Sequence, residues 1–177
     1  MEIIVRRLCP RDLEGVAHVH DSAFPRQHYS WEWLECNFGA FPRMQYFVAE
    51  EAGRMAGYIH WSQKSGFHTE VVLEIEQIAV YPDRQGRGIG EALIINSLPE
   101  VNLQLQGMGA ELKHIIVTTR ADNAALQIYR KTLGVEIGAV IKSIYPADEV
   151  LMVARCVEVP QGATRYSSSD GLKGDNG

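Results

Sequence analysis

A chain of 177 residues is long enough for one domain with a full hydrophobic core and too short for two such domains. Hydrophobic residues make up 46% of the chain and charged residues 22%, the composition of an ordinary globular protein. The formal net charge of −5 argues against a general nucleic-acid binder, so we expect neither nucleic acid nor a membrane among its partners.

Hydrophobic periodicity and helix-capping residues divide most of the chain into strands and helices. Ser30 is the expected N-cap of the second helix, and Gly134 should end the last one. Pro99 should break or kink the third helix, which then runs to about Ser97. The predicted elements are a strand at 2–7, a helix from Pro10, a helix at 30–37, a strand hairpin at 45–50 and 55–63, a strand at 71–80, a helix from 91, a strand at 113–119, a helix ending at 131 and a closing hairpin at 135–144 and 150–157.

The composition changes near the C-terminus. Residues 158–177 are rich in Gly, Ser, Asp and Asn and have no periodicity, which is typical of a flexible extension. We therefore expect one domain at 1–157 and a flexible tail at 158–177.

A glycine-rich loop follows the strand that ends at Val80, and a helix follows this loop at once. Gly86, Gly88 and Gly90 stand at alternate positions, which lets successive backbone N–H groups point into one concavity. The helix adds the partial positive charge of its N-terminus. The loop therefore predicts an anion cradle suited to a pyrophosphate.

The residues around the loop exclude two common phosphate-binding motifs. A dinucleotide fingerprint needs a third Gly where Glu91 stands, and an NTPase loop needs Lys-Ser or Lys-Thr after the last Gly. The pattern that is present, Val80-x4-Gln85-x2-Gly88-x-Gly90, resembles the GCN5-related N-acetyltransferase (GNAT) superfamily. The resemblance implies acetyl-coenzyme A as co-substrate, without a metal. A glycine-rich turn that binds no ligand is the alternative.

A second segment, from Asn123 to Gly134, is similar to the family's Asn- and Tyr-containing motif. In relatives the Asn and the Tyr reach the pantetheine arm and the thioester sulfur, which implies these roles for Asn123 and Tyr129. A tyrosine hydroxyl, with an ordinary pKa of about 10, keeps its proton near neutrality and can donate it to a leaving thiolate. Tyr129 is therefore the candidate general acid, and packing of its ring is the alternative.

Glu74 and Glu76 lie on the strand that enters the glycine loop. Two acidic side chains are unusual in a strand that should be mostly buried, because burial of an unpaired charge costs free energy. One of them could deprotonate the incoming ammonium, directly or through water, and family members place a base at either position. The alternative is a solvated edge or an ion pair with Arg54 or Lys113.

The end of the same strand should act through its backbone. Strict alternation puts both acids on one face with Ile78 and Val80, unless a bulge intervenes. The resemblance implies that this segment splays from the next strand after Thr118, which opens a slot for the pantetheine, and that its N–H groups polarise the thioester carbonyl. The cofactor-binding residues so implied are Ile78, Ala79, Val80, Gln85, Gly86, Arg87, Gly88, Ile89, Gly90, Asn123 and Tyr129.

The acceptor amine should meet the loop between the first two helices and the final hairpin, where Phe24, Tyr29 and Tyr145 are the candidate side chains. This arrangement is similar to enzymes that acetylate protein N-termini, including the ribosomal-protein N-terminal acetyltransferases. Those enzymes usually carry a Glu where Thr118 stands and paired tyrosines where Ile144 stands.

Cys9, Cys36 and Cys156 are odd in number and lack metal or redox spacing, which is typical of reduced thiols. No apolar run reaches membrane-spanning length, and the N-terminal residues do not resemble a signal peptide. We therefore expect a cytoplasmic protein.

The resemblance covers nearly the whole chain and implies a single-domain α/β (α+β) GNAT fold, with a mixed, twisted central sheet of six to seven strands and about four helices. The expected activity is direct acetyl transfer to a primary amine, either a protein or peptide N-terminal α-amine or a small free amine or amino acid. A catalytically silent coenzyme A-binding regulatory module is the alternative of another class. Tyr129 and the strand acids argue against it, because such a module needs no acid or base. The sequence leaves open the acceptor's identity and the oligomeric state, including a homodimer.

Overall fold

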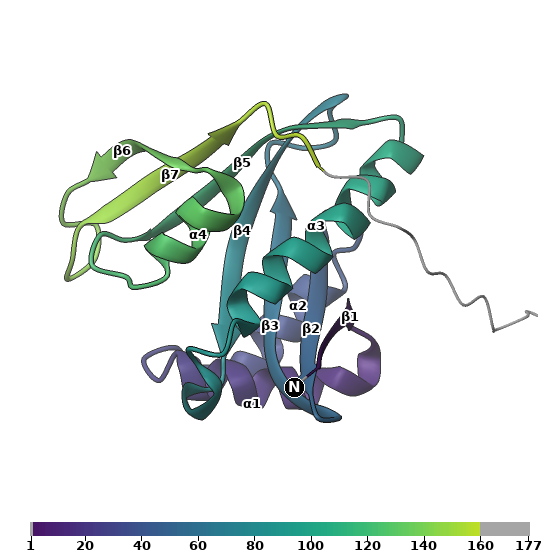
Figure 1. The fold of residues 1–177 in the computed structure, drawn as a ribbon, viewed down its shortest axis with the longest axis vertical. Coiled ribbons are helices and arrows are strands. Elements are labelled where there is room, and N and C mark those ends of the chain that lie inside the picture. The colour runs from purple at the N-terminus through teal and green to yellow at the C-terminus, as the bar shows by residue number, and fades with distance from the viewer. Residues whose placement is uncertain (1, 160–177) are drawn as a thin grey trace, which may run out of the picture.

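A twisted seven-stranded sheet forms the centre of the structure, a computed structural model that describes residues 2–159 (Figure 1). The strands are β1 (Ile3–Arg7), β2 (Met44–Glu51), β3 (Arg54–Gln63), β4 (Glu70–Val80), β5 (Glu111–Arg120), β6 (Glu136–Ile141) and β7 (Glu149–Arg155). Within the described residues their order is β1-β2-β3-β4-β5-β7-β6, and β4 and β5 are the only parallel neighbours. The predicted tail at 158–177 lies outside the described residues, except for its first two positions.

Helices cover both faces of this sheet (Figure 1). The helices α1 (Leu13–Ala23) and α2 (Ser30–Phe38) pack on one face, and α3 (Ile89–Gly107) and α4 (Leu126–Leu133) pack on the other. Short 3-10 turns, at Pro10–Asp12 and Pro82–Arg84, precede α1 and the glycine loop. Seven strands and four α-helices within residues 2–159 confirm the predicted α/β fold with a mixed central sheet.

Two apolar cores, one on each face of the sheet, hold the layers together. On the α3 face Trp61, Leu93 and Ile115 are completely buried. On the α1 face Val16 and Leu34 are buried against the same sheet. Burying an aliphatic side chain of this size contributes about 2 kcal/mol. The sheet is therefore fixed from both sides along β2, β3 and β4.

The helix α3 runs without interruption through Pro99, so the predicted end near Ser97 was wrong. Proline removes one backbone hydrogen bond from the helix interior and crowds the preceding turn. Beyond it, Val101 and Leu105 are completely buried in the core. Ser97 Oγ also accepts a hydrogen bond from Trp61 Nε1 at 2.8 Å. This packing keeps the second half of the helix on the sheet in spite of the proline.

Ser30 is the first residue of α2 but does not cap the helix, so the prediction of Ser30 as its N-cap was wrong. The residue before the helix is Tyr29, in the left-handed region with φ of 60°, and the helix has no side-chain cap. The Ser30 hydroxyl donates to Asp21 and lies 2.8 Å from His20 Nδ1 instead. A tertiary contact with α1 therefore uses the side chain that the sequence pattern assigned to a cap.

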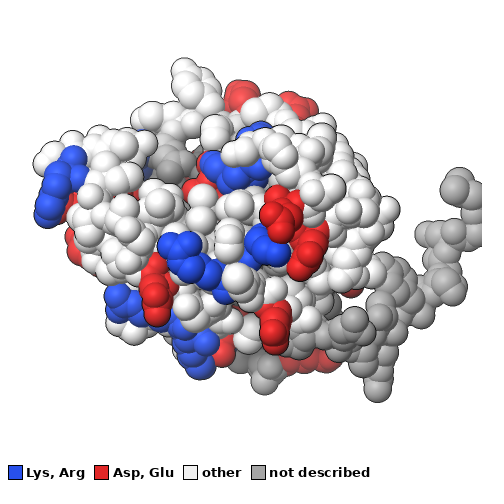
Figure 2. Space-filling model, turned by 90° about the horizontal axis from the view of Figure 1, so that it is seen from above, with Lys and Arg blue, Asp and Glu red and all other residues white. Residues whose placement is uncertain are grey.

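Surface charges form pairs of opposite sign. Figure 2 shows acidic and basic side chains interspersed over the face of the molecule seen from above, so that neither sign dominates it. Lys113 pairs with Glu70 at 2.9 Å, for example. Exposed pairs of this kind contribute little to stability, because water screens them.

The cluster of Arg6, Asp12 and Glu50 is better shielded. Arg6 Nη1 and Nη2 donate to the two carboxylate oxygens of Asp12 at 2.6 and 2.9 Å, and Arg6 Nε donates to Glu50 at 3.0 Å. The side chain of Asp12 is only 8% exposed and also accepts the backbone N–H of Cys9. The hydrogen bonds from Arg6 hold the pKa of Asp12 well below its ordinary value. This cluster fastens β1 and β2 to the start of α1.

We expect Asp12→Asn to lower the free energy of unfolding by about 2 kcal/mol at pH 7, because it removes the partner of a shielded guanidinium. The pKa of Asp12 is lowered by folding, so its stabilisation is complete above the unfolded-state pKa of about 3.9 and is lost as the pH falls below that value. Urea unfolding at pH 7 and pH 3 measures both effects. Asp122→Asn is the control, because Asp122 is 65% exposed in its pair with Arg120 and should change stability little. A difference between wild type and Asp12→Asn that does not shrink at pH 3 would contradict this assignment.

Candidate active site

A β-bulge in β4 sets the direction of its acidic side chains. The pairing of β4 with β3 skips Glu76, which is the extra residue of the bulge. The residues of β4 that pack against the α3-side core are Val71, Leu73 and Ile75 before the bulge and Ile78 and Val80 after it. Glu74 and Glu76 therefore point to the α1 side. Strict alternation would have put both acids on the face of Ile78 and Val80. The bulge interrupts this alternation, so the acids lie on the opposite face of the sheet.

The strands β4 and β5 separate next to this bulge (Figure 1). Their pairing begins at Glu70 with Glu111 and ends at Glu74 with Ile116, although β4 continues to Val80 and β5 to Arg120. The last pair therefore lies two residues before Thr118, the residue after which the family resemblance implied the separation. Beyond the last pair, the backbone groups that β4 turns toward β5 have no partner on that strand. An extended ligand can hydrogen-bond there as an additional strand.

The two acids have different surroundings. Glu74 is 8% exposed, and its carboxylate contacts Lys64 Nζ at 2.6 Å and accepts from Thr118 Oγ1 at 3.2 Å. Glu76 is exposed and accepts a single hydrogen bond in the described part of the chain, from Ser62 Oγ at 3.2 Å. The charge of Glu74 is therefore compensated, whereas the carboxylate of Glu76 remains accessible. The cation beside Glu74 is Lys64, which the sequence analysis did not consider.

Tyr129 lies on α4 with its ring in the α3-side core and is only 4% exposed. Burial raises the pKa of Tyr129 to about 12. Its hydroxyl has no hydrogen-bond partner among the described residues, so it keeps a proton and has an unused donor. The unused donor suits contact with a leaving sulfur, whereas the raised pKa keeps the hydroxyl protonated but makes it a weaker acid than an ordinary tyrosine.

Asn123 organises the turn that leads from β5 into α4. Its Oδ1 accepts the backbone N–H of Ala125 at 2.9 Å, and its Nδ2 donates to Thr119 Oγ1 at 2.7 Å. Gly134 ends α4 with φ of 63°, as predicted. Two of the four hydrogen-bonding positions of the Asn123 amide are therefore used within the protein, and one N–H and one lone pair have no partner among the described residues.

The glycine loop has the geometry of an anion cradle. Gly86 and Gly88 have φ of 74° and 80°, the left-handed region that favours glycine, and Gly88 is the N-cap of α3. Within the described chain, the backbone N–H groups of residues 85–91 donate to no protein acceptor. Gly90 differs from the other two, because it lies inside α3 and packs against Ile128 of α4. The free donors and the helix N-terminus fit a pyrophosphate.

Gln77, directly after the bulge, connects β4 to α1 and α2. Its Oε1 accepts from Tyr58 Oη at 3.0 Å and from Trp33 Nε1 at 3.3 Å. Its Nε2 lies 3.4 Å from Nε2 of His20, and burial lowers the pKa of His20. The amide can donate only to an unprotonated His20 Nε2, so Nδ1 carries the imidazole proton and donates to Ser30. The sequence analysis missed Gln77; its signal is a polar side chain between two apolar stretches of a strand.

The predicted acceptor residues stand on the α1 side of the sheet and on the final hairpin. Phe24 is half-buried and packs against His20 with ring centroids 5.0 Å apart. Tyr29 is 78% exposed and Tyr145 is 66% exposed. No hydrogen bond or aromatic contact within residues 2–159 joins these three side chains, so their role in acceptor binding stays a prediction.

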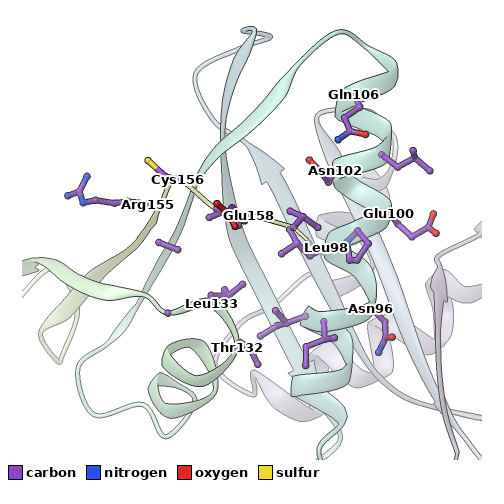
Figure 3. A pocket seen from close by; sticks show the side chains of 18 residues that line it. Asn96, Leu98, Glu100, Asn102, Gln106, Thr132, Leu133, Arg155, Cys156 and Glu158 are labelled. Carbon is purple, nitrogen blue, oxygen red and sulfur yellow. The ribbon is translucent and has the colours of Figure 1, made fainter. Parts of the chain in front are cut away.

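A separate cavity of about 790 Å³ lies between α3 and the segment that follows β7 (Figure 3). Leu98, Leu133 and Cys156 line it, and none of the predicted site residues does. Among residues 2–159, no three His, Cys, Asp or Glu side chains are grouped as a metal site would require. None of the helices described here combines the length and the apolar character that crossing a membrane requires.

Comparison with known proteins identifies similar domains. The profile of the Acetyltransferase (GNAT) domain matches residues 42–132. The mycothiol acetyltransferase of Mycolicibacterium gilvum is 30% identical over 137 residues, which are 72% of this chain and 43% of that protein. This chain therefore spans less than half the length of that curated relative.

Solved structures share the fold. The ribosomal-protein-S18-alanine N-acetyltransferase from Escherichia coli matches with a TM-score of 0.69 at 22% identity, over 93% of this chain and 99% of that chain. The structure of Arabidopsis thaliana NAA60 in complex with acetyl-CoA matches with a TM-score of 0.67 at 20% identity, over 86% of this chain and 97% of that chain. At these identities the likeness supports the fold alone.

The glycine loop offers a matched pair of substitutions. Gly88→Ala forces an alanine into the left-handed region, so it should cost about 1 kcal/mol of stability and weaken coenzyme A binding about fivefold or more. Gly90→Ala should change both less than Gly88→Ala does, because Gly90 has an ordinary helical conformation and its added Cβ would lie 3.6 Å from Ile128. Calorimetric titration and thermal unfolding of the two variants measure the difference. Equal coenzyme A affinities for Gly88→Ala and wild type would exclude the loop as the pyrophosphate site.

Proposed function

Because the chain belongs to the GNAT acetyltransferase family, we propose that it transfers an acetyl group from acetyl-coenzyme A directly to a primary amine. The observation that carries the proposal is the separation of β4 from β5 beside the exposed carboxylate of Glu76. A strand that is hydrogen-bonded to a neighbour on each side has no free backbone donors for a ligand. Here such donors occur next to a group that can accept a proton.

The free N–H groups of residues 85–91 and the unpaired edge of β4 fit two adjoining parts of acetyl-coenzyme A. The loop would hold its pyrophosphate, and the backbone of residues 78–80 would hold its pantetheine amides. When bound, acetyl-coenzyme A supplies an activated thioester carbonyl. Backbone N–H groups of β4 would then stabilise negative charge on the carbonyl oxygen, a contribution that depends on their fixed positions.

Glu76 is the better candidate for the base. Its carboxylate is exposed on the bulge and has one weak hydrogen bond, so it can approach an acceptor amine directly or through water. Glu74 is held by Lys64 and Thr118. Protonation of Glu74 would cost the ion pair with Lys64, whereas protonation of Glu76 breaks no such contact.

Tyr129 would protonate the leaving sulfur. The hydroxyl has no other partner among the described residues, and its raised pKa keeps it protonated throughout the physiological range. The ammonium loses two protons as it becomes an amide. Glu76 would take the first and release it to solvent. The second, lost from the nitrogen of the tetrahedral intermediate, would balance the proton that Tyr129 gives to the thiolate, so that one proton is released in each turnover.

A peptide α-amine is the acceptor we favour, because Tyr29 and Tyr145 leave large aromatic surfaces exposed around the acceptor side. A small free amine is the second candidate, supported by the sequence match to a mycothiol acetyltransferase. A panel of peptides and small amines, assayed by thiol release, separates the two. Coenzyme A binding without transfer to any acceptor would favour the catalytically silent module instead.

The two acids give a matched test of the base. We expect Glu76→Gln to lower kcat about 10²-fold or more, because it removes the proton acceptor but keeps the size of the side chain. Glu74→Gln should act mainly on stability, because it leaves Lys64 without its buried partner. Steady-state kinetics and urea unfolding of both variants measure this. If Glu74→Gln has the larger effect on kcat, the roles of the two acids are exchanged.

Tyr129→Phe separates chemistry from packing, since it keeps the ring and removes only the hydroxyl. If the hydroxyl is the acid, kcat falls about 10²-fold while coenzyme A affinity and melting temperature stay near those of wild type. Because burial raises the pKa of Tyr129 to about 12, the loss should be the same at pH 7 and pH 9. Single-turnover transfer at both pH values measures it. Near wild-type turnover would mean that water protonates the sulfur.

A further inference from the structure

Glu51 is a buried carboxylate that the proposed chemistry does not use. It is the last residue of β2 and only 3% exposed. Its Oε2 accepts from Arg84 Nη1 at 2.9 Å and from Arg87 Nη1 at 3.3 Å. Arg84 ends the 3-10 turn that precedes the glycine loop, and Arg87 stands between the two left-handed glycines of the loop. One carboxylate at the end of β2 therefore holds two cations, one just before the glycine loop and one within it.

The two arginines are held unequally. The side chain of Arg84 is 14% exposed and makes the shorter contact, so it forms a shielded pair with Glu51. The side chain of Arg87 is 45% exposed, makes the longer contact, and donates a second hydrogen bond to the carbonyl oxygen of Asp83 at 3.1 Å. Arg84 is thus an anchor, whereas Arg87 lies at the surface of the loop, where it can reach an anion.

We propose that Glu51 is a positioning residue for coenzyme A, which holds Arg84 and Arg87 so that the loop presents its free N–H groups and the Arg87 guanidinium to the pyrophosphate. The inference rests on the proposed function, because it assumes that this loop binds the cofactor. Within the cluster of Glu51, Arg84 and Arg87, two guanidiniums and one carboxylate leave a single positive charge.

Removing the carboxylate has two opposite effects on an anion bound at the loop. The loss of a negative charge favours the anion by Coulomb attraction. The loss of the anchor frees both arginines and leaves Arg84, which is nearly buried, without a partner. A carboxylate that only repels the cofactor would make Glu51→Gln bind more tightly, whereas a positioning residue makes it bind more weakly. The sign of the change therefore decides between the two.

Calorimetric titration with coenzyme A, repeated in the presence of inorganic pyrophosphate, tests the proposal without an acceptor. We expect Glu51→Gln to weaken coenzyme A binding about tenfold, as for the loss of a charged hydrogen bond, and to abolish competition by pyrophosphate. Glu51→Asp keeps the buried charge but shortens the side chain, so it should fold and show a smaller loss. It also keeps the test valid if Glu51→Gln does not fold.

Glu50→Gln is the matched control, because Glu50 is the neighbouring acid on β2 and pairs with Arg6 away from the loop. It should lower stability and keep the coenzyme A affinity of wild type. Unchanged or tighter binding in folded Glu51→Gln, or equal losses in Glu51→Gln and Glu50→Gln, would overturn the positioning role. If wild type itself binds no coenzyme A, it is the proposed function that fails.

Discussion

Backbone hydrogen bonding along β4 is the constraint on which the rest of the structure depends. Every buried N–H and C=O needs a partner, and an interior strand normally finds partners on both sides. β4 keeps its partner β3 to the end but loses β5 after Glu74. The bulge at Glu76 lies next to this separation, and the glycine loop continues directly from the strand. One interrupted ladder thus places a carboxylate, free backbone groups and an anion cradle beside one another.

The parts of the site that depend on local backbone chemistry could be predicted from the sequence. Gly86 and Gly88 occupy the left-handed region, and Asn123 accepts a nearby backbone N–H, as their residue types indicate. The order of strands and helices could also be predicted, because hydrophobic periodicity is a property of short stretches of sequence. Where the residue type and its backbone conformation are linked within a few positions, the sequence contains the information.

The remaining features depend on contacts distant in sequence. Glu74 and Glu76 differ because Lys64 and Thr118 reach only the first of them. The helix α3 continues through Pro99 because residues beyond it are buried in a core that other strands complete. Ser30 turns to His20 and Asp21 rather than to its own helix. In each case a tertiary contact outweighs a local preference, and no pattern along the chain specifies it.

The parallel pairing of β4 and β5 also has a consequence for the order of folding. Antiparallel neighbours such as β2 and β3 are joined by a short turn and can pair early, since little loop entropy is lost. β4 and β5 can pair only after the glycine loop and the 19 residues of α3 have crossed the sheet. Their ladder is also short, ending at Glu74. We therefore expect the pairing of β4 with β5, which ends where the candidate site begins, to form later in folding than the pairing of β2 with β3.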